Sequence, residues 1–136
     1  MADSFRLTLA QWNPTMGDLD GNADLARRAW QQGREAGANL VALPEMFITG
    51  YNTQDLVMKP AFQSAAIAAI ETLARDCADG PALAIGGPAM QDGALYNAYY
   101  ILQGGRVAAR VFKHHLPNET VFDEKRIYAS GAVTGP

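Results

Sequence analysis

The stretch that decides the fold is Asn39–Glu45, NLVALPE, an apolar run of strand length that ends in a carboxylate. Such a run is typical of a strand buried on both faces, as in a parallel sheet. In open α/β sheets, ligands bind beyond the carboxyl ends of parallel strands. Glu45 therefore has the position of a residue that meets a substrate, although an ordinary strand-end acid in water explains the position equally well.

The segments around this run alternate between strand and helix patterns. A helix with Asn22 as its N-cap and Gly37 as its stop precedes the run, and a strand comes before that helix. The order predicts an α/β fold whose sheet begins parallel. The alternating segments are the strand 5–12, the helix 22–37, the helix 62–77 and the strand 82–87.

Two further strand patterns, 95–102 and 106–113, flank Gln103-Gly104-Gly105, a turn that suits an antiparallel hairpin. Strict alternation along 106–113 places Val107 and Lys113 on one face, in line with apolar side chains. Lys113 is therefore predicted to point into the protein. A slip of register, or a strand that ends at Phe112, would return it to solvent.

A lysine on an apolar face requires a partner, because an unpaired buried charge is costly or loses its proton. Glu45 is the natural candidate. A semi-buried carboxylate can move protons, and an ammonium group can stabilise a developing oxyanion. The pair suits acyl transfer at an amide or a nitrile, a reaction that also requires a nucleophile.

The other reactive side chains have simpler interpretations. Cys77, the single cysteine, falls in the apolar stripe of a helix and is predicted to be a core residue. His114 and His115 are interpreted as loop residues, since no third group completes a catalytic set or a metal site. The charged cluster 123–126, DEKR, is interpreted as a solvated face or a local ion-pair network.

Composition limits the remaining classes of function. The 136 residues are 49% hydrophobic, enough for one domain or part of one, and the net charge of −3 argues against a nucleic-acid partner. No apolar run approaches the roughly 20 residues of a membrane span, and the N-terminus lacks the pattern of a secretory signal, which predicts a cytoplasmic protein. Gly86-Gly87 is not part of a nucleotide-binding glycine motif.

Three motifs in order along the chain resemble the nitrilase, or carbon-nitrogen hydrolase, superfamily: LPEMFITGY (43–51), FKHHLPN (112–118) and VFDEKR (121–126). Longer stretches are more narrowly similar to the N-terminal glutaminase domain of glutamine-dependent NAD+ synthetases. These are AQWNPTMGDLDGN (10–22), TGYNTQDL (49–56) and KHHLPNETVFDEKR (113–126). The resemblance implies a four-layer α-β-β-α sandwich, of which residues 1–136 would form the N-terminal half.

The resemblance also implies a Glu, Lys and Cys triad that hydrolyses glutamine and supplies ammonia for ATP-dependent NAD+ synthesis. Glu45 matches the general base and Lys113 the lysine that stabilises the tetrahedral intermediate. Tyr51, Phe122 and Glu119 match substrate-binding positions, although a tyrosine is expected in many relatives where Glu119 stands. The family's nucleophile, a cysteine followed by Glu-Asp, does not occur in this sequence.

These implications lead to further expectations. The glutaminase step would use glutamine and no cofactor or metal, while ATP and Mg would belong only to the synthetase domain outside these residues. The isolated chain is predicted to be inactive and to associate with itself or with the missing part of the enzyme. The alternatives are another nitrilase-type amidase or carbamoylase, or a non-catalytic binding module that lacks the nucleophile.

Overall fold

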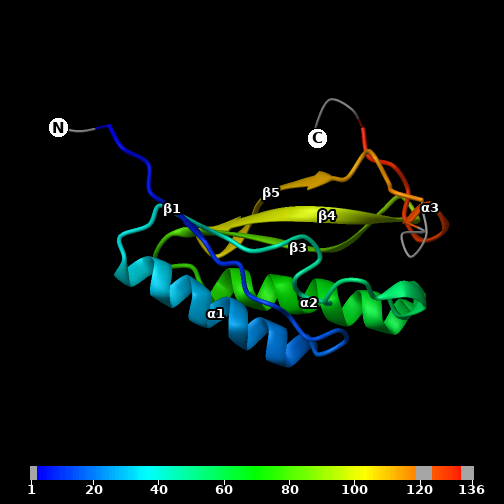
Figure 1. The fold of residues 1–136 in the computed structure, drawn as a ribbon, viewed down its shortest axis with the longest axis horizontal. Helices are drawn as coiled ribbons and strands as arrows, with labels where there is room; N and C mark the ends of the chain where they lie inside the picture. Colours follow the sequence, from blue (N-terminus) through cyan, green and yellow to red (C-terminus); the bar gives the residue numbers. More distant parts are fainter. Residues whose placement is uncertain (1–2, 119–123, 133–136) are drawn as a thin grey trace.

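The computed structural model describes residues 3–118 and 124–132. It contains one five-stranded sheet, with two long helices packed against one of its faces (Figure 1). The strands are β1 (Leu7–Leu9), β2 (Leu40–Ala42), β3 (Ala82–Gln91), β4 (Ala94–Gln103) and β5 (Arg106–Phe112). The helices are α1 (Leu19–Glu35), α2 (Pro60–Asp76), α3 (Glu124–Ile127) and the 3-10 helix η1 (Gln54–Met58).

The strands follow one another across the sheet in the order of the sequence, β1-β2-β3-β4-β5. The first three are parallel and are joined through α1 and α2, whereas β4 and β5 are antiparallel to their neighbours. The predicted α/β sheet that begins parallel and ends antiparallel is confirmed. The β3–β4 hairpin was not predicted, although its Asp92-Gly93 turn, with φ of 50° and 78°, is a strong hairpin signal.

The core lies between the sheet and the two long helices. Val41, Leu83 and Ile85 are fully buried, and Trp30 of α1 packs with them while its indole N–H donates to Pro81 O at 2.8 Å. Neither of the two long helices covers the opposite face of the sheet. We call it the open face; on it Leu9 of β1 is 64% exposed. The chain therefore forms one helical layer and one sheet layer, half of the expected four-layer sandwich.

The N-terminus of α1 differs from the prediction. Asp18 is the N-cap, and its carboxylate accepts the Gly21 N–H at 3.0 Å. Asn22, the predicted cap, lies inside the helix and is fully buried. Its side chain accepts from Thr15 N at 2.8 Å and donates to Thr15 O at 2.8 Å and Ile48 O at 3.0 Å. The helix thus begins after Asp18, which precedes Asn22 in the sequence. The Asn22 side chain instead anchors the loops that contain Thr15 and Ile48.

β5 contains a β-bulge that interrupts its alternation. Leu102 of β4 pairs with Val107, but Ile101 pairs with Ala109, so Ala108 is an extra residue. Val107, before the bulge, lines a hollow on the helical side together with residues of α2. Ala109 and Val111, after the bulge, pair with Ile101 and Tyr99 and lie on the open face. The prediction that Val107 and Lys113 share a face is wrong for this reason.

None of the helices in the described ranges combines the length and the hydropathy that a bilayer span requires.

Candidate functional site

Glu45 and Lys113, which are 68 positions apart in sequence, form an ion pair on the open face. Glu45 follows β2 by three residues, and Lys113 follows β5 directly. The Nζ atom of Lys113 lies 2.9 Å from Oε1 of Glu45. The predicted partnership is thus confirmed, but the pair faces away from the helical core and not into it.

The backbone holds Lys113 on both sides. β5 ends one residue before the predicted boundary, yet the Lys113 N–H still donates to Asn97 O at 2.8 Å, which continues the ladder with β4. On the other side, Gly131 N donates to Lys113 O at 2.9 Å. The side chain is 27% exposed, so the strand end does not release it into solvent.

Glu45 is held by the close approach of its loop to β3. Gly86 donates to Pro44 O at 3.3 Å and accepts from Ile48 N at 3.2 Å. A Cβ on Gly86 would overlap Met46 N and would lie 2.8 Å from the Glu45 Cα, so only glycine fits there. Met46 itself has a φ of 51°, a left-handed conformation that surrounding packing must maintain.

Glu124 is a third member of the site. Its side chain is 2% exposed, and its Oε1 lies 3.2 Å from Lys113 Nζ. The same oxygen accepts the hydroxyl of Tyr51 at 2.6 Å. The interpretation of the 123–126 cluster as a solvated face is therefore wrong for Glu124, whereas its ion-pair alternative holds, since Glu124 pairs with Lys113 and Arg126 pairs with Asp55. Asp123 lies outside the described residues.

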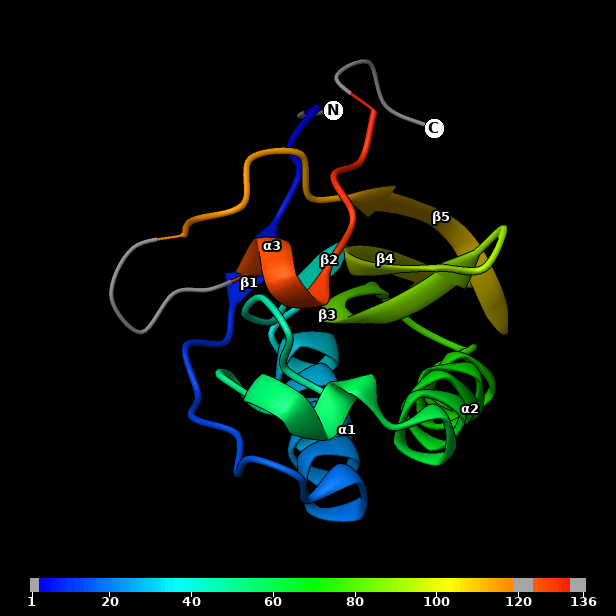
Figure 2. The ribbon, with the colours of Figure 1, turned by 90° about the vertical axis from the view of Figure 1, so that its right-hand side faces the viewer.

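A small apolar cluster brings α3, and with it Glu124, to the site. In the view of Figure 2, α3 lies next to β2 and β3. Met46, Val57, Leu116 and Tyr128 are buried together, apart from the main core. The backbone of the segment is also fixed, since Ala129 N donates to Leu95 O of β4 at 2.8 Å. One sequence signal was available: Glu124, Ile127 and Tyr128 have the i, i+3, i+4 spacing of one helical face.

The substrate-binding predictions have different outcomes. Tyr51 lies at the site, 39% exposed, with its hydroxyl bound to Glu124. Burial and then the hydrogen bond to Glu124 raise the pKa of the Tyr51 hydroxyl, which therefore keeps its proton. A contact with substrate remains a prediction for Tyr51. Phe122 and Glu119 lie outside the described residues.

The charge state of Lys113 limits its chemistry. Burial alone would lower the pKa of the ammonium group, but the hydrogen bond and charge of Glu45, followed by those of Glu124, outweigh it and raise the pKa above its ordinary value. Lys113 consequently stays protonated at neutral pH. It can donate hydrogen bonds and stabilise negative charge, and it cannot serve as the base.

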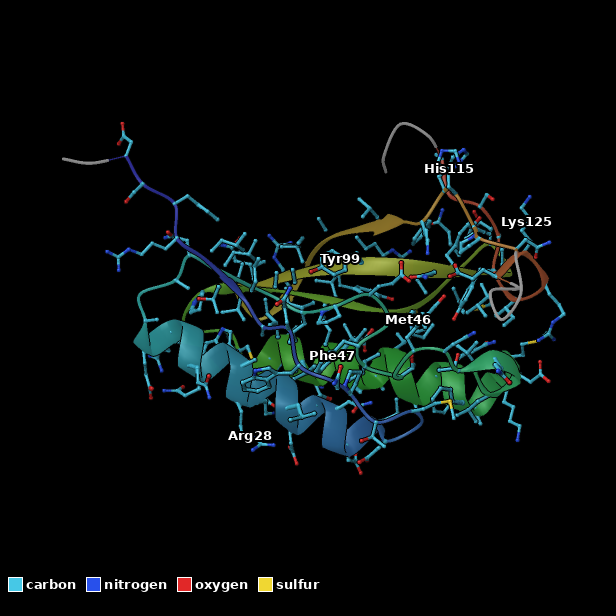
Figure 3. All side chains as sticks on the ribbon, viewed as in Figure 1. Arg28, Met46, Phe47, Tyr99, His115 and Lys125 are labelled. Carbon is cyan, nitrogen blue, oxygen red and sulfur yellow. The ribbon has the colours of Figure 1, made fainter. Side chains whose placement is uncertain are left out.

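A cavity of about 380 Å³ lies over the ion pair on the open face. Its volume suits a small ligand. Tyr99, seen on β4 in Figure 3, closes one side, with its hydroxyl tied to Leu43 O at 2.7 Å. The residues that line this cavity are Leu43, Glu45, Asn97, Ala98, Tyr99, Val111, Phe112 and Lys113.

Cys77 does not belong to this site. It lies at the end of α2, 3% exposed in the core between the helices and the sheet, as predicted. The sheet separates it from Glu45 and Lys113, and burial raises the pKa of its thiol to about 11. It therefore cannot supply the nucleophile.

The histidines are also apart from the chemistry. His114 Nδ1 bonds with Gly131 O at 2.6 Å, and His115 is exposed at the surface (Figure 3). Within residues 3–118 and 124–132, no three His, Cys, Asp or Glu side chains are grouped as metal ligands.

A model of the carbon-nitrogen hydrolase family matches residues 6–135. The chain belongs to the carbon-nitrogen hydrolase family. It is 59% identical, over all 136 residues, to the glutamine-dependent NAD(+) synthetase of Rhodobacter capsulatus, of which it spans 25%. The chain thus covers about a quarter of that relative's length.

Solved structures agree with this assignment. A glutamine-dependent NAD(+) synthetase from Cytophaga hutchinsonii superposes with a TM-score of 0.89 at 28% identity, covering 96% of this chain and 22% of that one. A mutant of the Nesterenkonia AN1 amidase, from the nitrilase superfamily, gives a TM-score of 0.79 at 26% identity, with 94% and 48% covered. The predicted nitrilase-type α/β fold is confirmed.

Proposed function

We propose that these residues form the N-terminal part of a longer enzyme that hydrolyses the side-chain amide of glutamine and supplies ammonia for ATP-dependent NAD+ synthesis. The observation that carries the proposal is the Lys113–Glu45 pair, 2.9 Å apart over a cavity on the open face. Similarity over the whole chain to a glutamine-dependent NAD(+) synthetase supports glutamine as the substrate.

In the proposed reaction, Glu45 takes the proton of a cysteine thiol as the sulfur attacks the amide carbon. The carbonyl oxygen becomes an oxyanion, which the Lys113 ammonium stabilises. The C–N bond then breaks, and Glu45 returns the proton to the leaving ammonia. Water, deprotonated by Glu45, hydrolyses the remaining thioester to glutamate.

The nucleophile has to come from outside these residues, because the single cysteine of the sequence lies under the sheet. We propose that the remainder of the natural protein supplies it and covers the open face with a second sheet. Glu124 and Tyr51 would then keep Lys113 in place, since Glu124 Oε1 accepts from both side chains at 3.2 Å and 2.6 Å.

The remaining expectations belong to the same proposal. The partners are glutamine and the rest of the enzyme or a second copy, without nucleic acid or membrane, and the protein works in the cytoplasm. The hydrolytic step needs no cofactor, since a carboxylate, an ammonium group and a thiol complete it. ATP and Mg would act in the synthetase part, beyond residues 1–136.

A second candidate is hydrolysis of another small amide. It is favoured by the structural likeness to an amidase, whose fold matches 94% of this chain. Both activities would use Glu45 and Lys113, so the substrate distinguishes them. The test compares ammonia release from glutamine with release from propionamide and acetamide.

The proposed function is tested in the natural full-length protein by measuring ammonia release and glutamine binding for the wild type and Glu45→Gln. Glu45→Gln keeps the shape of the side chain but cannot accept a proton, so we expect glutamine to bind with similar affinity while turnover stops. Good turnover combined with poor glutamine binding in this variant would contradict the role of Glu45 as the base.

A further inference from the structure

Two buried side-chain polar atoms have no hydrogen-bond partner within the part of the chain that the structure describes: Nδ2 of Asn97 and Oε2 of Glu124. Native proteins leave few such atoms, because each has lost its hydration without replacement. Both residues adjoin Lys113, whose ammonium group bonds to Glu124 and whose N–H donates to Asn97 O. The gaps in hydrogen bonding are thus concentrated at the candidate site.

Asn97 lies on β4 directly opposite Lys113. Its carbonyl accepts the Lys113 N–H at 2.8 Å, and the next residues, Ala98 and Phe112, are paired in the sheet. Residues opposite each other in an antiparallel pair point to the same face. The Asn97 amide therefore lies on the open face, 2% exposed, and contributes to the cavity wall with Glu45 and Lys113.

Asn22 shows that this chain can satisfy a buried asparagine. Asn22 is 0% exposed; its side-chain oxygen accepts from Thr15 N, and its side-chain nitrogen donates to Thr15 O and Ile48 O. Asn97 is equally buried, but its Nδ2 has no acceptor among the described residues. The difference points to an acceptor that arrives with a ligand.

The nearby groups determine what that acceptor is. Lys113 Nζ is itself a donor, and it already engages one oxygen each of Glu45 and Glu124. An amide donor and an ammonium group that line the same cavity can both donate to a single oxygen atom, the arrangement that stabilises an oxyanion. The Asn97 side chain is 2% exposed, so an oxygen atom of a ligand can approach its amide only through the cavity that Asn97 lines with Glu45 and Lys113.

We propose that Asn97 Nδ2 donates a hydrogen bond to the carbonyl oxygen of the substrate amide, next to Lys113 Nζ. The bond strengthens as that oxygen becomes negative in the tetrahedral intermediate. The inference rests on the proposed amide hydrolysis and adds a residue that contacts the reacting group.

The test uses Asn97→Leu in the natural full-length protein. Leucine has about the size of asparagine and no donor, so kcat for ammonia release from glutamine is expected to fall about 10²–10³-fold, the usual effect of removing one oxyanion donor. The Tm should stay the same or rise, because an unpaired buried donor is removed. The matched control is Asn22→Leu, which breaks satisfied hydrogen bonds and is expected to lower the Tm.

An Asn97→Leu protein whose kcat stays within threefold of the wild type overturns the inference. If its Tm also falls, the amide serves a contact with another part of the protein. Should Asn97→Leu fail to fold, Asn97→Asp decides by the same kcat criterion, since it keeps the shape and lacks the donor.

The wild-type assay separates the two proposals. A wild type that hydrolyses glutamine, with an unaffected Asn97→Leu, refutes only the role of Asn97. A wild type that acts on propionamide but not on glutamine refutes the proposed substrate, and the Asn97 comparison is then made with propionamide. Inactivity on every amide refutes both.

Discussion

At the scale of single residues, Lys113 serves both the proposed chemistry and the stability of the site. It lies 2.9 Å from the half-exposed Glu45 and 3.2 Å from the buried Glu124. The first contact leaves the ammonium group at the mouth of the cavity. The second compensates a carboxylate with 2% exposure, and a buried charge that loses its partner is strongly destabilising.

Lys113→Ala should therefore lower activity and stability together. In the full-length protein we expect an activation barrier higher by roughly 3 kcal/mol or more, from loss of oxyanion stabilisation. We also expect the free energy of unfolding to fall by about 3 kcal/mol, because Glu124 is left without its cation. Ammonia release and urea unfolding measure the two effects.

Arg126→Ala is the matched control for Lys113→Ala. Arg126 pairs with Asp55 at 2.6 Å, but both side chains are largely exposed, so we expect a change in the free energy of unfolding of no more than about 1 kcal/mol. Near wild-type turnover in Lys113→Ala would exclude the role of Lys113 as the oxyanion donor.

The thiol of Cys77 provides a pH-dependent test of its burial. Its pKa rises from 9.0 to about 11 in the folded protein, mainly through burial, so the folded state binds the proton more tightly than the unfolded state. This contribution to stability is complete below about pH 9 and is lost as the pH rises toward 11. The measurement is the difference in unfolding free energy between wild type and Cys77→Ala from pH 7 to 11.

Chemical labelling of the thiol provides a second test of the burial of Cys77. Iodoacetamide at pH 8 should modify Cys77 only after unfolding, because the thiol is buried and protonated. Rapid labelling of Cys77 in the folded protein would show that this part of the core is open.

At the scale of elements, β3 positions the loop that carries Glu45 through Gly86. Gly86→Ala should push the Glu45–Met46 backbone away from β3, because the new Cβ would overlap Met46 N. We expect a loss of activity of at least tenfold together with lower stability, since the displaced atoms are backbone. The measurements are kcat and Tm in the full-length protein.

Gly87→Ala on the same strand is the control. Its Cβ would meet the side-chain ends of Ile70 and Ile48 at 2.6 Å and 2.9 Å, on the helical side. We expect it to cost stability by overpacking while changing kcat per folded molecule less than Gly86→Ala does. Equal loss of kcat in both variants would contradict the positioning role of Gly86.

The elements themselves could be predicted from local patterns where one period dominates. The strand after Asn39 and the helix up to Gly37 have continuous apolar or 3.6-residue patterns, and the structure contains both. β5 could not be predicted in detail, because a bulge changes the phase of alternation without leaving a mark in composition. The Lys113–Glu45 pair was nevertheless found, since a lysine that is shielded from solvent requires a carboxylate whichever face of the sheet it occupies.

Glu124 was missed for a different reason. Its neighbours in sequence are charged, and only the docking of Tyr128 against Met46, in a loop far away in sequence, buries it. The spacing of Glu124, Ile127 and Tyr128 indicates a shared helical face, but it does not identify what that face packs against. Asn97 likewise could not be identified, because what distinguishes it is a buried Nδ2 without an acceptor among the described residues, which only a structure can show.

At the scale of the whole molecule, the open face predicts the behaviour of the 136-residue chain on its own. Leu7, Leu9 and Val111 are 51%, 64% and 47% exposed on this face. Exposed apolar surface of this kind favours association. We expect sedimentation to show concentration-dependent association, which Leu9→Lys reduces.

The same isolated chain is expected to release no ammonia from glutamine, because its one cysteine lies beneath the sheet. A matched assay of the full-length protein is the positive control. Ammonia release by the 136-residue chain above that of Glu45→Gln in the same chain would show that another group replaces the thiol.

The bulge at Ala108 has a consequence for changes in chain length. Ala109 already pairs with Ile101, so a deletion of Ala108 leaves every later residue of β5 opposite its present partner. A deletion of Val111, after the bulge, would instead shift Lys113 by one position and turn its ammonium group toward the helices. The strand can therefore become one residue shorter at the bulge, but not after it, and still place its lysine at the site.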